Sequence, residues 1–371
     1  MIADVPLGIF LSGGIDSSLV ASHAQKLSLK PVRTFTIGIG DRQSDESPFA
    51  LKIAEHLGTE HTQLHATARD ALNLVPRMAE MYGEPFADSS QIPTHLLCRL
   101  TRSSGITVAL SGDGGDELFG GYNNYTTFYR HRGILSLIRP SVASKIAGAL
   151  AAPALHDFCR MAAGDVMDLR ILRALRFLSN GSATSAFWGR YSARSLPERL
   201  VRHAPAGSSL SAVYNCEGTL TERAMCQDLM MYLPDDILVK VDRASMAVAL
   251  EVRAPFADDV NLFNAAWNTP LHHKMDERGG KLVLKKALAR YVPERLFERP
   301  KQGFMIPLVQ WLLKDLDEWV RACIAPDRIR REGFLEPVVV EEIFAGARRG
   351  NAVLAYKLWA VCMFQSWLEA R

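Results

Sequence analysis

Short apolar runs alternate with longer stretches of helical periodicity over roughly the first 125 residues of the chain. The short runs predict β-strands because they are rich in β-branched or aromatic residues and end at turn residues. Four strands are expected, over Leu7–Leu11, Thr34–Ile39, Glu60–His65 and Ile106–Leu110. Helices are expected between them, over residues 18–27, 48–57, 68–82 and 94–102. Such alternation is typical of a parallel sheet with helices on its faces.

The strand pattern fades after about residue 123, and helical periodicity continues from there to the C-terminus. Clear helical stretches are Val283–Arg290 and Ala352–Leu368, and the segment Pro234–Val252 is expected to be a helix with proline in its first turn. The sequence therefore predicts an α/β part over residues 1–125 and a mainly helical part over residues 126–371.

Composition narrows the classes of protein to which the chain can belong. It has 371 residues, 48% of them hydrophobic, and 43 Lys and Arg against 40 Asp and Glu, a net charge of +3. So small a charge argues against nucleic acid or an anionic membrane as the main partner. No signal pattern and no apolar run of 18 residues is present, and the six scattered cysteines have no zinc-type spacing. Free thiols and a cytoplasmic location are expected.

Two glycine-rich turns directly follow predicted strands. Ser12–Ser18 (SGGIDSS) follows the first strand, and Ser111–Glu117 (SGDGGDE) follows the fourth. Ligands of parallel α/β sheets bind at the carboxyl ends of the strands. A glycine-rich turn that opens a helix lets backbone N–H groups approach an anion, and the helix dipole favours negative charge there. The first turn is therefore suited to a phosphate group.

An aspartate in each turn specifies what kind of phosphate compound would fit. Asp16 and Asp116 would repel a bare polyphosphate, but carboxylates together with phosphate oxygens are good ligands for Mg²⁺. The G-x-x-x-x-G-K-[ST] loop is absent, and no G-x-G-x-x-G follows a strand, which disfavours P-loop and dinucleotide enzymes. A metal-bound nucleotide is the expected ligand. For either turn alone, a simple strand-to-helix connection is the alternative.

The two turns resemble the pyrophosphate-binding motifs of the ATP pyrophosphatases, and nearly the whole chain is similar to the synthetase domain of the glutamine-hydrolysing asparagine synthetases. The likeness includes LPDDILVKVDRASMAVALEVRAPF at residues 233–256 and RPKQGF at residues 299–304. It implies a parallel, doubly wound sheet of the adenine nucleotide alpha-hydrolase type with a mostly helical C-terminal part. ATP and Mg²⁺ are the cofactors that it implies.

The resemblance also assigns residues to the nucleotide. By it, the pyrophosphate portion of ATP is held by Ser12, Gly13, Gly14, Asp16 and Ser17. Asp16 and Asp116 bind Mg²⁺. Further positions match ones that contact the nucleotide, namely Leu11, Ile37, Ser111 and Gly112.

Three residues are assigned to catalysis in the same way. Lys301 would stabilise charge at the α-phosphate, where removal of one such contact commonly costs on the order of 10²-fold in rate, and Arg243 would approach the departing pyrophosphate. Asp113 would be the general base that takes a proton from ammonia. A surface lysine and a salt-bridged helix surface are the alternatives for the first two. Some family members carry glutamate at the position of Asp113, which leaves the length of the acceptor open.

Two further segments are weighed between function and structure. Phe86–Pro93 (FADSSQIP) falls where family members build part of the acceptor pocket, with a capped loop as the alternative. Glu251 and Arg253 are equally consistent with a structural ion pair.

The expected activity is that of an ATP-dependent ligase that converts aspartate to asparagine through β-aspartyl-AMP, with release of AMP and pyrophosphate. A β-lactam or lasso-peptide cyclase of the same fold is the nearest alternative. A tRNA-modifying ATP pyrophosphatase is less favoured, since catalytic cysteines and a basic surface are not evident. A nucleotide-binding module without turnover is a third alternative.

The source of nitrogen is the largest departure from the family pattern. Full-length family members carry an N-terminal glutaminase with a cysteine nucleophile, whereas residue 2 here is Ile and six residues precede the first predicted strand. The expected partners are therefore aspartate and either free ammonia or ammonia from a glutaminase domain or subunit. A homodimer remains open, and neither nucleic acid nor a membrane is expected.

Overall fold

A five-stranded parallel sheet lies at the centre of the N-terminal part of the computed structural model, which describes residues 3–39, 45–133, 142, 145, 197–202, 217–299 and 306–371. The order of the strands across the sheet is β3-β2-β1-β4-β5. Their bounds are β1 Leu7–Phe10, β2 Arg33–Ile39, β3 Glu60–Ala66, β4 Val108–Leu110 and β5 Glu251–Arg253. All pairs are parallel, so the α/β class predicted from the sequence is confirmed.

The edge strand β5 was not expected, because it comes from the part of the chain that the sequence predicts to be helical. Glu251 pairs with Val108 and Arg253 with Leu110, so β5 extends the sheet beside β4. A strand of three residues is too short to show an alternating pattern. The ion pair that the sequence offered as an alternative is present, with Nε of Arg253 2.5 Å from Oε1 of Glu251.

Helices cover both faces of the sheet. One face packs on a core shared with α1 (Ile15–Leu27), α2 (Ser47–Leu57) and α17 (Leu282–Leu288). The other face packs on a core shared with α3 (Ala68–Tyr82) and α4 (Gln91–Ser103). This two-sided cover explains why Ile9, Phe35 and Ala109 are completely buried. The arrangement is the expected doubly wound sheet.

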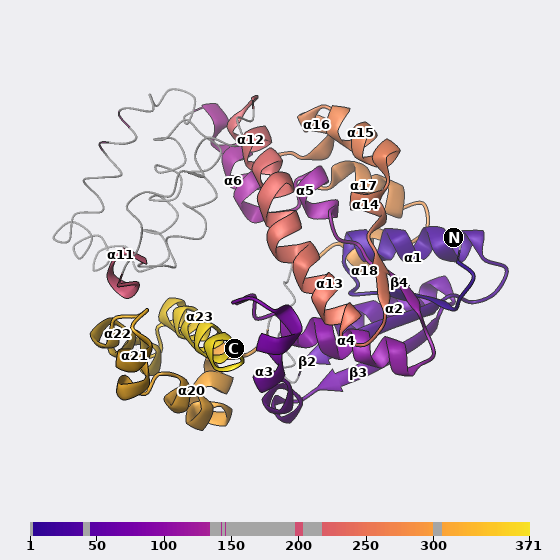
Figure 1. Cartoon of the computed structure of the whole chain (residues 1–371). Coiled ribbons are helices and arrows are strands. Elements are labelled where there is room, and N and C mark those ends of the chain that lie inside the picture. The colour runs from indigo at the N-terminus through magenta and orange to yellow at the C-terminus, as the bar shows by residue number, and fades with distance from the viewer. Residues whose placement is uncertain are drawn as a thin grey trace.

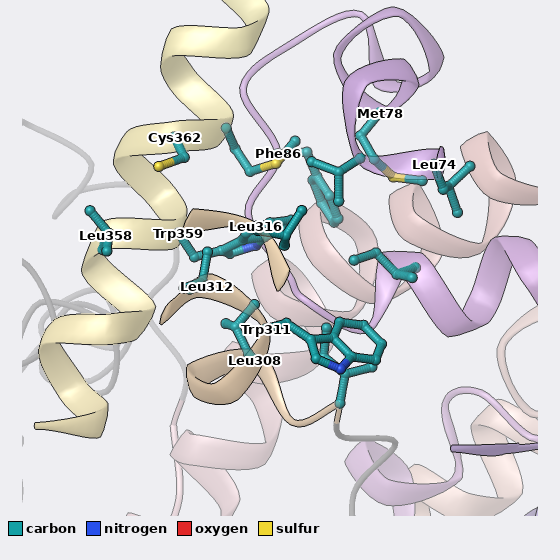
Figure 2. Close-up of a cluster of buried hydrophobic side chains, with 14 of the residues drawn as sticks. Leu74, Met78, Phe86, Leu308, Trp311, Leu312, Leu316, Leu358, Trp359 and Cys362 are labelled. Carbon is teal, nitrogen blue, oxygen red and sulfur yellow. The ribbon is translucent and has the colours of Figure 1, made fainter. Parts of the chain in front are cut away.

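The core beneath α3 and α4 continues into the C-terminal helices. These are η4 (Trp311–Asp315), α20 (Asp317–Cys323), α22 (Pro337–Arg348) and α23 (Ala352–Glu369). Figure 2 shows Trp359 of α23 beside Leu312 and Leu316, with Met78 of α3 and Phe86 close by. Trp359 and Leu312 are fully buried. The C-terminal helices therefore share a hydrophobic core with the helices of the sheet.

A long helical stretch crosses the middle of the molecule as three consecutive elements (Figure 1): α12 (Leu220–Gln227), η3 (Asp228–Leu238) and α13 (Val239–Met246). The expectation that a helix begins at Pro234 is wrong. Thr219 and Glu222 form a capping box at the true start, and Pro234 lies inside the π-helical element η3. The wider turn of a π-helix tolerates an irregularity in the backbone hydrogen bonds, which the missing N–H of proline creates.

The remaining described helices are short. They are α5 (Gly115–Phe119), α6 (Asn123–Arg130), α11 (Pro197–Leu200), α14 (Pro255–Asp258), α15 (Val260–Asn268), α16 (Leu271–Lys274), α18 (Glu294–Phe297), α19 (Leu308–Gln310) and α21 (Pro326–Glu332). No helix among the described residues combines the length and the apolar composition needed to cross a bilayer.

The cysteines depart in part from the sequence expectation. Cys98, Cys323 and Cys362 are buried free thiols. Cys226 is disulfide-bonded, so the expectation of thiols throughout is wrong at this position. Scattered cysteine spacing carries no information on which pairs the fold brings together.

Candidate functional site

The two glycine-rich turns lie against each other at the carboxyl edge of the sheet. They follow β1 and β4, which are neighbours although β2 and β3 intervene in the chain, so the turns flank the point where the strand order reverses. A Cβ atom added to Gly112 would lie 2.8 Å from the backbone nitrogen of Ser17, and one added to Gly115 would lie 2.6 Å from Oδ1 of Asp16. The two turns that follow predicted strands in the sequence are therefore in contact, and this contact requires glycine at both positions.

Hydrogen bonds between its own residues give the first turn its shape. The hydroxyls of Ser12 and Ser17 are 3.0 Å apart, Ser17 Oγ accepts from the Ser12 N–H at 3.2 Å, and Ser12 Oγ accepts from the Gly14 N–H at 3.3 Å. Gly13 has a φ of +75°, and a side chain there would meet the backbone of Ala50 in α2. The turn ends at Gly14, the N-cap of the 13-residue helix α1, whose dipole favours an anion at this point.

Lys281 joins the aspartates of the two turns. Its Nζ donates to Oδ2 of Asp16 and lies 2.8 Å from Oδ1 of Asp116. Burial alone would lower the pKa of Lys281, but the carboxylates of Asp116 and Asp16 outweigh burial and raise it, so the side chain is an ammonium ion. Both aspartates therefore lie within reach of one cation. Sequence analysis missed Lys281, and its signal was Gly279–Gly280–Lys281 directly before an apolar helix.

The donor set at this point suits a metal that arrives with its nucleotide. Among the described residues, no group of three or more His, Cys, Asp or Glu side chains could hold a metal ion by itself. Two carboxylates, Asp16 and Asp116, converge on one position. Mg²⁺ in nucleotide sites is commonly bound by one or two carboxylates together with phosphate oxygens. The residues present fit that mode and do not form a closed metal cage.

A second charged group lies where the sequence placed the acceptor pocket. Nζ of Lys240 in α13 is 2.8 Å from Oδ2 of Asp88, whose Oδ1 accepts from the N–H and the hydroxyl of Ser90. Burial favours protonation of Asp88, but Lys240 and Ser90 outweigh it and lower the pKa of this carboxyl. The segment Phe86–Pro93 thus combines a turn, closed by Asp88 on Ser90, with a salt bridge to Lys240, and its last three residues begin α4.

Asp113 lies close to this pair. Burial raises the pKa of Asp113, while the hydroxyl of Ser111 and the ammonium of Lys240 oppose the shift. A carboxylate with a raised pKa is a stronger base than an ordinary aspartate, which is the property that a proton acceptor needs. The second turn therefore carries one carboxylate that contacts Lys281, Asp116, and a second with a raised pKa, Asp113.

The other predicted residues are placed as follows. Leu11 and Ile37 are almost completely buried at the ends of β1 and β2, and the N–H of Ser111 donates to the carbonyl oxygen of Arg253 at 2.9 Å. Arg243 is exposed on α13, and within the described residues its guanidinium makes no hydrogen bond or ion pair. Lys301 lies outside the described residues. The structure therefore brings the two turns together, and among the residues that it describes no hydrogen bond or ion pair joins the Arg243 side chain to them.

Arg299, the first residue of RPKQGF, is anchored beside the first turn. Its Nη2 lies 2.9 Å from Oε1 of Glu46 and 3.4 Å from the carbonyl oxygen of Ser12, and its guanidinium stacks 4.3 Å from the ring centre of Phe49. These contacts fix the start of the segment that continues to Lys301. Sequence analysis did not assign Arg299 a role.

A buried polar network lies behind Asp116. The Tyr122 hydroxyl donates to Oε1 of Glu117 at 2.6 Å, and the Tyr125 hydroxyl donates to Oδ2 of Asp228 at 2.5 Å. Burial, followed by the nearby charge of Asp116, raises the pKa of Glu117 to about 7. These hydrogen bonds connect α5 to the start of α6, and α6 to η3.

Comparison with known proteins gives a consistent result. The family model described as asparagine synthase matches residues 1–369. The chain is 30% identical over 99% of its length to the glutamine-hydrolysing asparagine synthetase 1 of Bacillus subtilis (strain 168), of which the match covers 56%. It is 30% identical over 99% of its length to a putative glutamine-hydrolysing asparagine synthetase of Mycobacterium bovis, and 32% identical over 69% to one of Methanocaldococcus jannaschii. The chain spans about half the length of these relatives.

Proposed function

Since the chain belongs to the asparagine synthase family, we propose that it is an ATP-dependent amide-forming ligase that converts aspartate to asparagine. A carboxylate does not accept ammonia at neutral pH, because oxide would have to leave. Attack of the β-carboxylate on the α-phosphorus of ATP forms β-aspartyl-AMP and releases pyrophosphate. Ammonia then attacks the acyl carbon, loses a proton, and AMP leaves.

The observation that carries this proposal is that Asp16 and Asp116, at the ends of two neighbouring strands, both contact the ammonium of Lys281. In open α/β sheets this switch point is where nucleotides bind. Backbone N–H groups at the start of α1 would hold the pyrophosphate portion, and the two carboxylates would hold Mg²⁺. When bound, Mg²⁺ would neutralise charge on the phosphate oxygens. Ser12, Gly13, Gly14 and Ser17 would line the phosphates, and Leu11, Ile37, Ser111 and Gly112 the rest of the nucleotide.

Cationic and basic side chains would serve the two chemical steps. Lys301 would stabilise charge that develops at the α-phosphate, and Arg243 would approach the leaving pyrophosphate. Asp113 would accept the proton that ammonia loses, in keeping with its raised pKa. Asp88 and Lys240 border the acceptor in this scheme, so an amino acid with both a charged amine and a carboxylate would find complementary charges.

We also propose that the chain is one synthetase-like unit, with an α/β part over residues 1–125 and a mainly helical part over residues 126–371 that completes the site. The matched relatives are named glutamine-hydrolysing and are about twice as long as the match. Ammonia would accordingly come from a glutaminase domain or subunit, or from solution.

The activity is tested by incubating the chain with ATP, Mg²⁺, ammonium chloride and one acceptor at a time. Pyrophosphate release is followed by a coupled assay, and products are identified by mass spectrometry. We expect aspartate to stimulate release and to yield asparagine and AMP in equal amounts. Stimulation by a peptide or by an N-substituted amino acid, with none by aspartate, would assign a cyclase activity of the same fold instead.

A further inference from the structure

Lys281 occupies the position between Asp16 and Asp116 that the proposed function gives to a divalent cation. Its ammonium contacts one oxygen of each carboxylate. The Lys281 side chain is only 8% exposed, and the side chains of Asp16 and Asp116 are 13% and 21% exposed. Two carboxylates held this close and away from water repel each other unless a cation lies between them.

The surrounding backbone is shaped to admit this ammonium. A Cβ atom on Gly121 would overlap Oδ1 of Asp116 and Cε of Lys281, although Gly121 has an ordinary backbone conformation. A Cβ atom on Gly280 would overlap the carbonyl oxygen of Gly120. Glycine at these positions therefore leaves room for the lysine side chain and for a close approach of its backbone to the end of α5.

The backbone of Lys281 is itself held in an unusual conformation. Its φ is +62°, in the left-handed region that residues other than glycine rarely adopt, and its N–H donates to the carbonyl oxygen of Phe119 at 2.8 Å. Such conformations are strained and persist where the surroundings enforce them. The placement of this ammonium is thus imposed by the fold, since a loose surface lysine would relax to a common conformation.

An ammonium and a divalent cation that use the same carboxylate oxygens compete for them. We propose that Lys281 is a resident counter-ion, which holds Asp16 and Asp116 together while no metal is bound and leaves them when a divalent cation binds. The inference rests on the proposed function in one respect, that a divalent cation belongs at these two aspartates. Without nucleotide, the chain should bind the metal weakly, because the ammonium of Lys281 already contacts Asp16 and Asp116.

The test measures binding of Mn²⁺ alone, without nucleotide or acceptor, by the electron paramagnetic resonance signal of the free ion. Lys281→Met should bind one Mn²⁺ at least roughly ten-fold more tightly than the wild-type chain, a difference of about 1.4 kcal/mol. Lys286→Met is the matched control, because it makes the same charge change at an exposed position of α17, the helix that begins directly after Lys281. It should bind Mn²⁺ as the wild-type chain does. Adding Asp116→Asn to Lys281→Met should abolish the gain, which locates the ion.

The outcomes separate this inference from the proposed function. Equal or weaker Mn²⁺ binding by Lys281→Met than by the wild-type chain overturns the role of Lys281 and leaves the metal site intact. If neither the wild-type chain nor Lys281→Met binds Mn²⁺, either alone or with ATP present, the metal assignment in the proposed function fails as well.

A melting experiment covers the case in which Lys281→Met folds poorly. Without metal, this variant should melt at a lower temperature than the wild-type chain, because the two carboxylates lose the ammonium of Lys281. Millimolar Mg²⁺ should raise the melting temperature of Lys281→Met by more than that of Lys286→Met, since a ligand stabilises the state that binds it. If Lys281→Met is unfolded without metal, Mg²⁺ should allow it to refold. An equal effect of Mg²⁺ on both variants contradicts the proposal. Lys281→Gln keeps a hydrogen-bond donor without the charge. Its melting temperature without metal should therefore lie between those of Lys281→Met and Lys286→Met.

Discussion

The ammonium of Lys240 donates to Oδ2 of Asp88 over 2.8 Å, and this largely buried pair links α13 to the loop that precedes α4. The two residues are 152 positions apart in the sequence. Their pairing draws together the two segments that would border the acceptor, one from the α/β part and one from the helical part. The Lys240–Asp88 pair therefore contributes both to the stability of the fold and to the relative position of the two segments that would border the acceptor.

Removal of one member of this pair should be costly. We expect Lys240→Met to lower the free energy of unfolding by about 3 kcal/mol, since Asp88 is left as a buried charge without its partner. The double variant Lys240→Met with Asp88→Asn should recover a large part of the loss. Urea denaturation measures both. Arg330→Met, which breaks an exposed pair with Asp327, is the control and should change stability by less than about 1 kcal/mol. Equal stability of Lys240→Met and wild type contradicts the assignment.

Asp113→Asn should separate the two half-reactions. Asparagine has nearly the same shape but cannot accept a proton, so ammonia-dependent amide formation should fall by about 10²-fold or more. Aspartate-dependent exchange of labelled pyrophosphate into ATP should persist, because the adenylation step does not use this base. In the wild-type chain, amide formation should decline at acid pH below a pKa higher than that of an ordinary aspartate. Loss of both half-reactions together would show that Asp113 has another role.

Glu117 gives a prediction about pH and stability. Burial raises the pKa of Glu117 from 4.5 to about 7, so between these values the folded chain holds a proton that the unfolded chain has lost. Stability from this group is therefore present below pH 4.5 and is lost as the pH rises to 7, by about 3 kcal/mol in total. Glu117→Gln should remove this dependence while keeping an acceptor for Tyr122. Urea denaturation without divalent cations measures the free energy of unfolding of both chains at pH 5 and pH 8. The stability of Glu117→Gln relative to wild type should be greater at pH 8 than at pH 5. The same relative stability at both pH values argues against the prediction.

Gly121→Ala tests the space around Lys281. The added methyl would overlap Asp116 and Lys281, so we expect a loss of about 2 kcal/mol in the free energy of unfolding. Gly279→Ala is a matched control from the same part of the chain, because a Cβ atom there meets no atom within 4 Å and the backbone conformation is an ordinary one. Thermal melting of both variants checks the prediction, and equal melting temperatures would refute it.

Much of the fold could be predicted from the sequence because its signals are local. The four strands predicted from the short apolar runs lie close to their expected positions. So does the helix that begins near Ser47 and ends before Gly58. These elements depend on periodicity, on capping and on a glycine with positive φ, which neighbouring residues report. The two turns could be placed at the same edge because all strands of a parallel sheet share one carboxyl edge. That β1 and β4 are direct neighbours is known only from the structure.

The features that the sequence did not reveal depend on contacts between distant segments. Strand β5 is too short to carry a pattern, and it exists because β4 offers an open edge to pair with. The start of the helix at Leu220 was missed because proline is typical of the first turn of a helix, so Pro234 indicated a start there, whereas the π-helical segment holds it in its interior. The pairing of Lys281 with Asp16 spans 265 residues, and one lysine among many gives no sign of its partner.

The central claim is that Asp16 and Asp116 hold a metal-bound ATP whose α-phosphorus is open to an acceptor carboxylate, and pyrophosphate release by Asp116→Ala tests it most directly. With ATP, Mg²⁺ and aspartate at saturation, we expect aspartate-dependent release to fall to the background without enzyme, while Asp327→Ala, at an almost fully exposed position, retains the wild-type rate. The background is measured without aspartate for each chain. Undiminished release by Asp116→Ala would contradict the account.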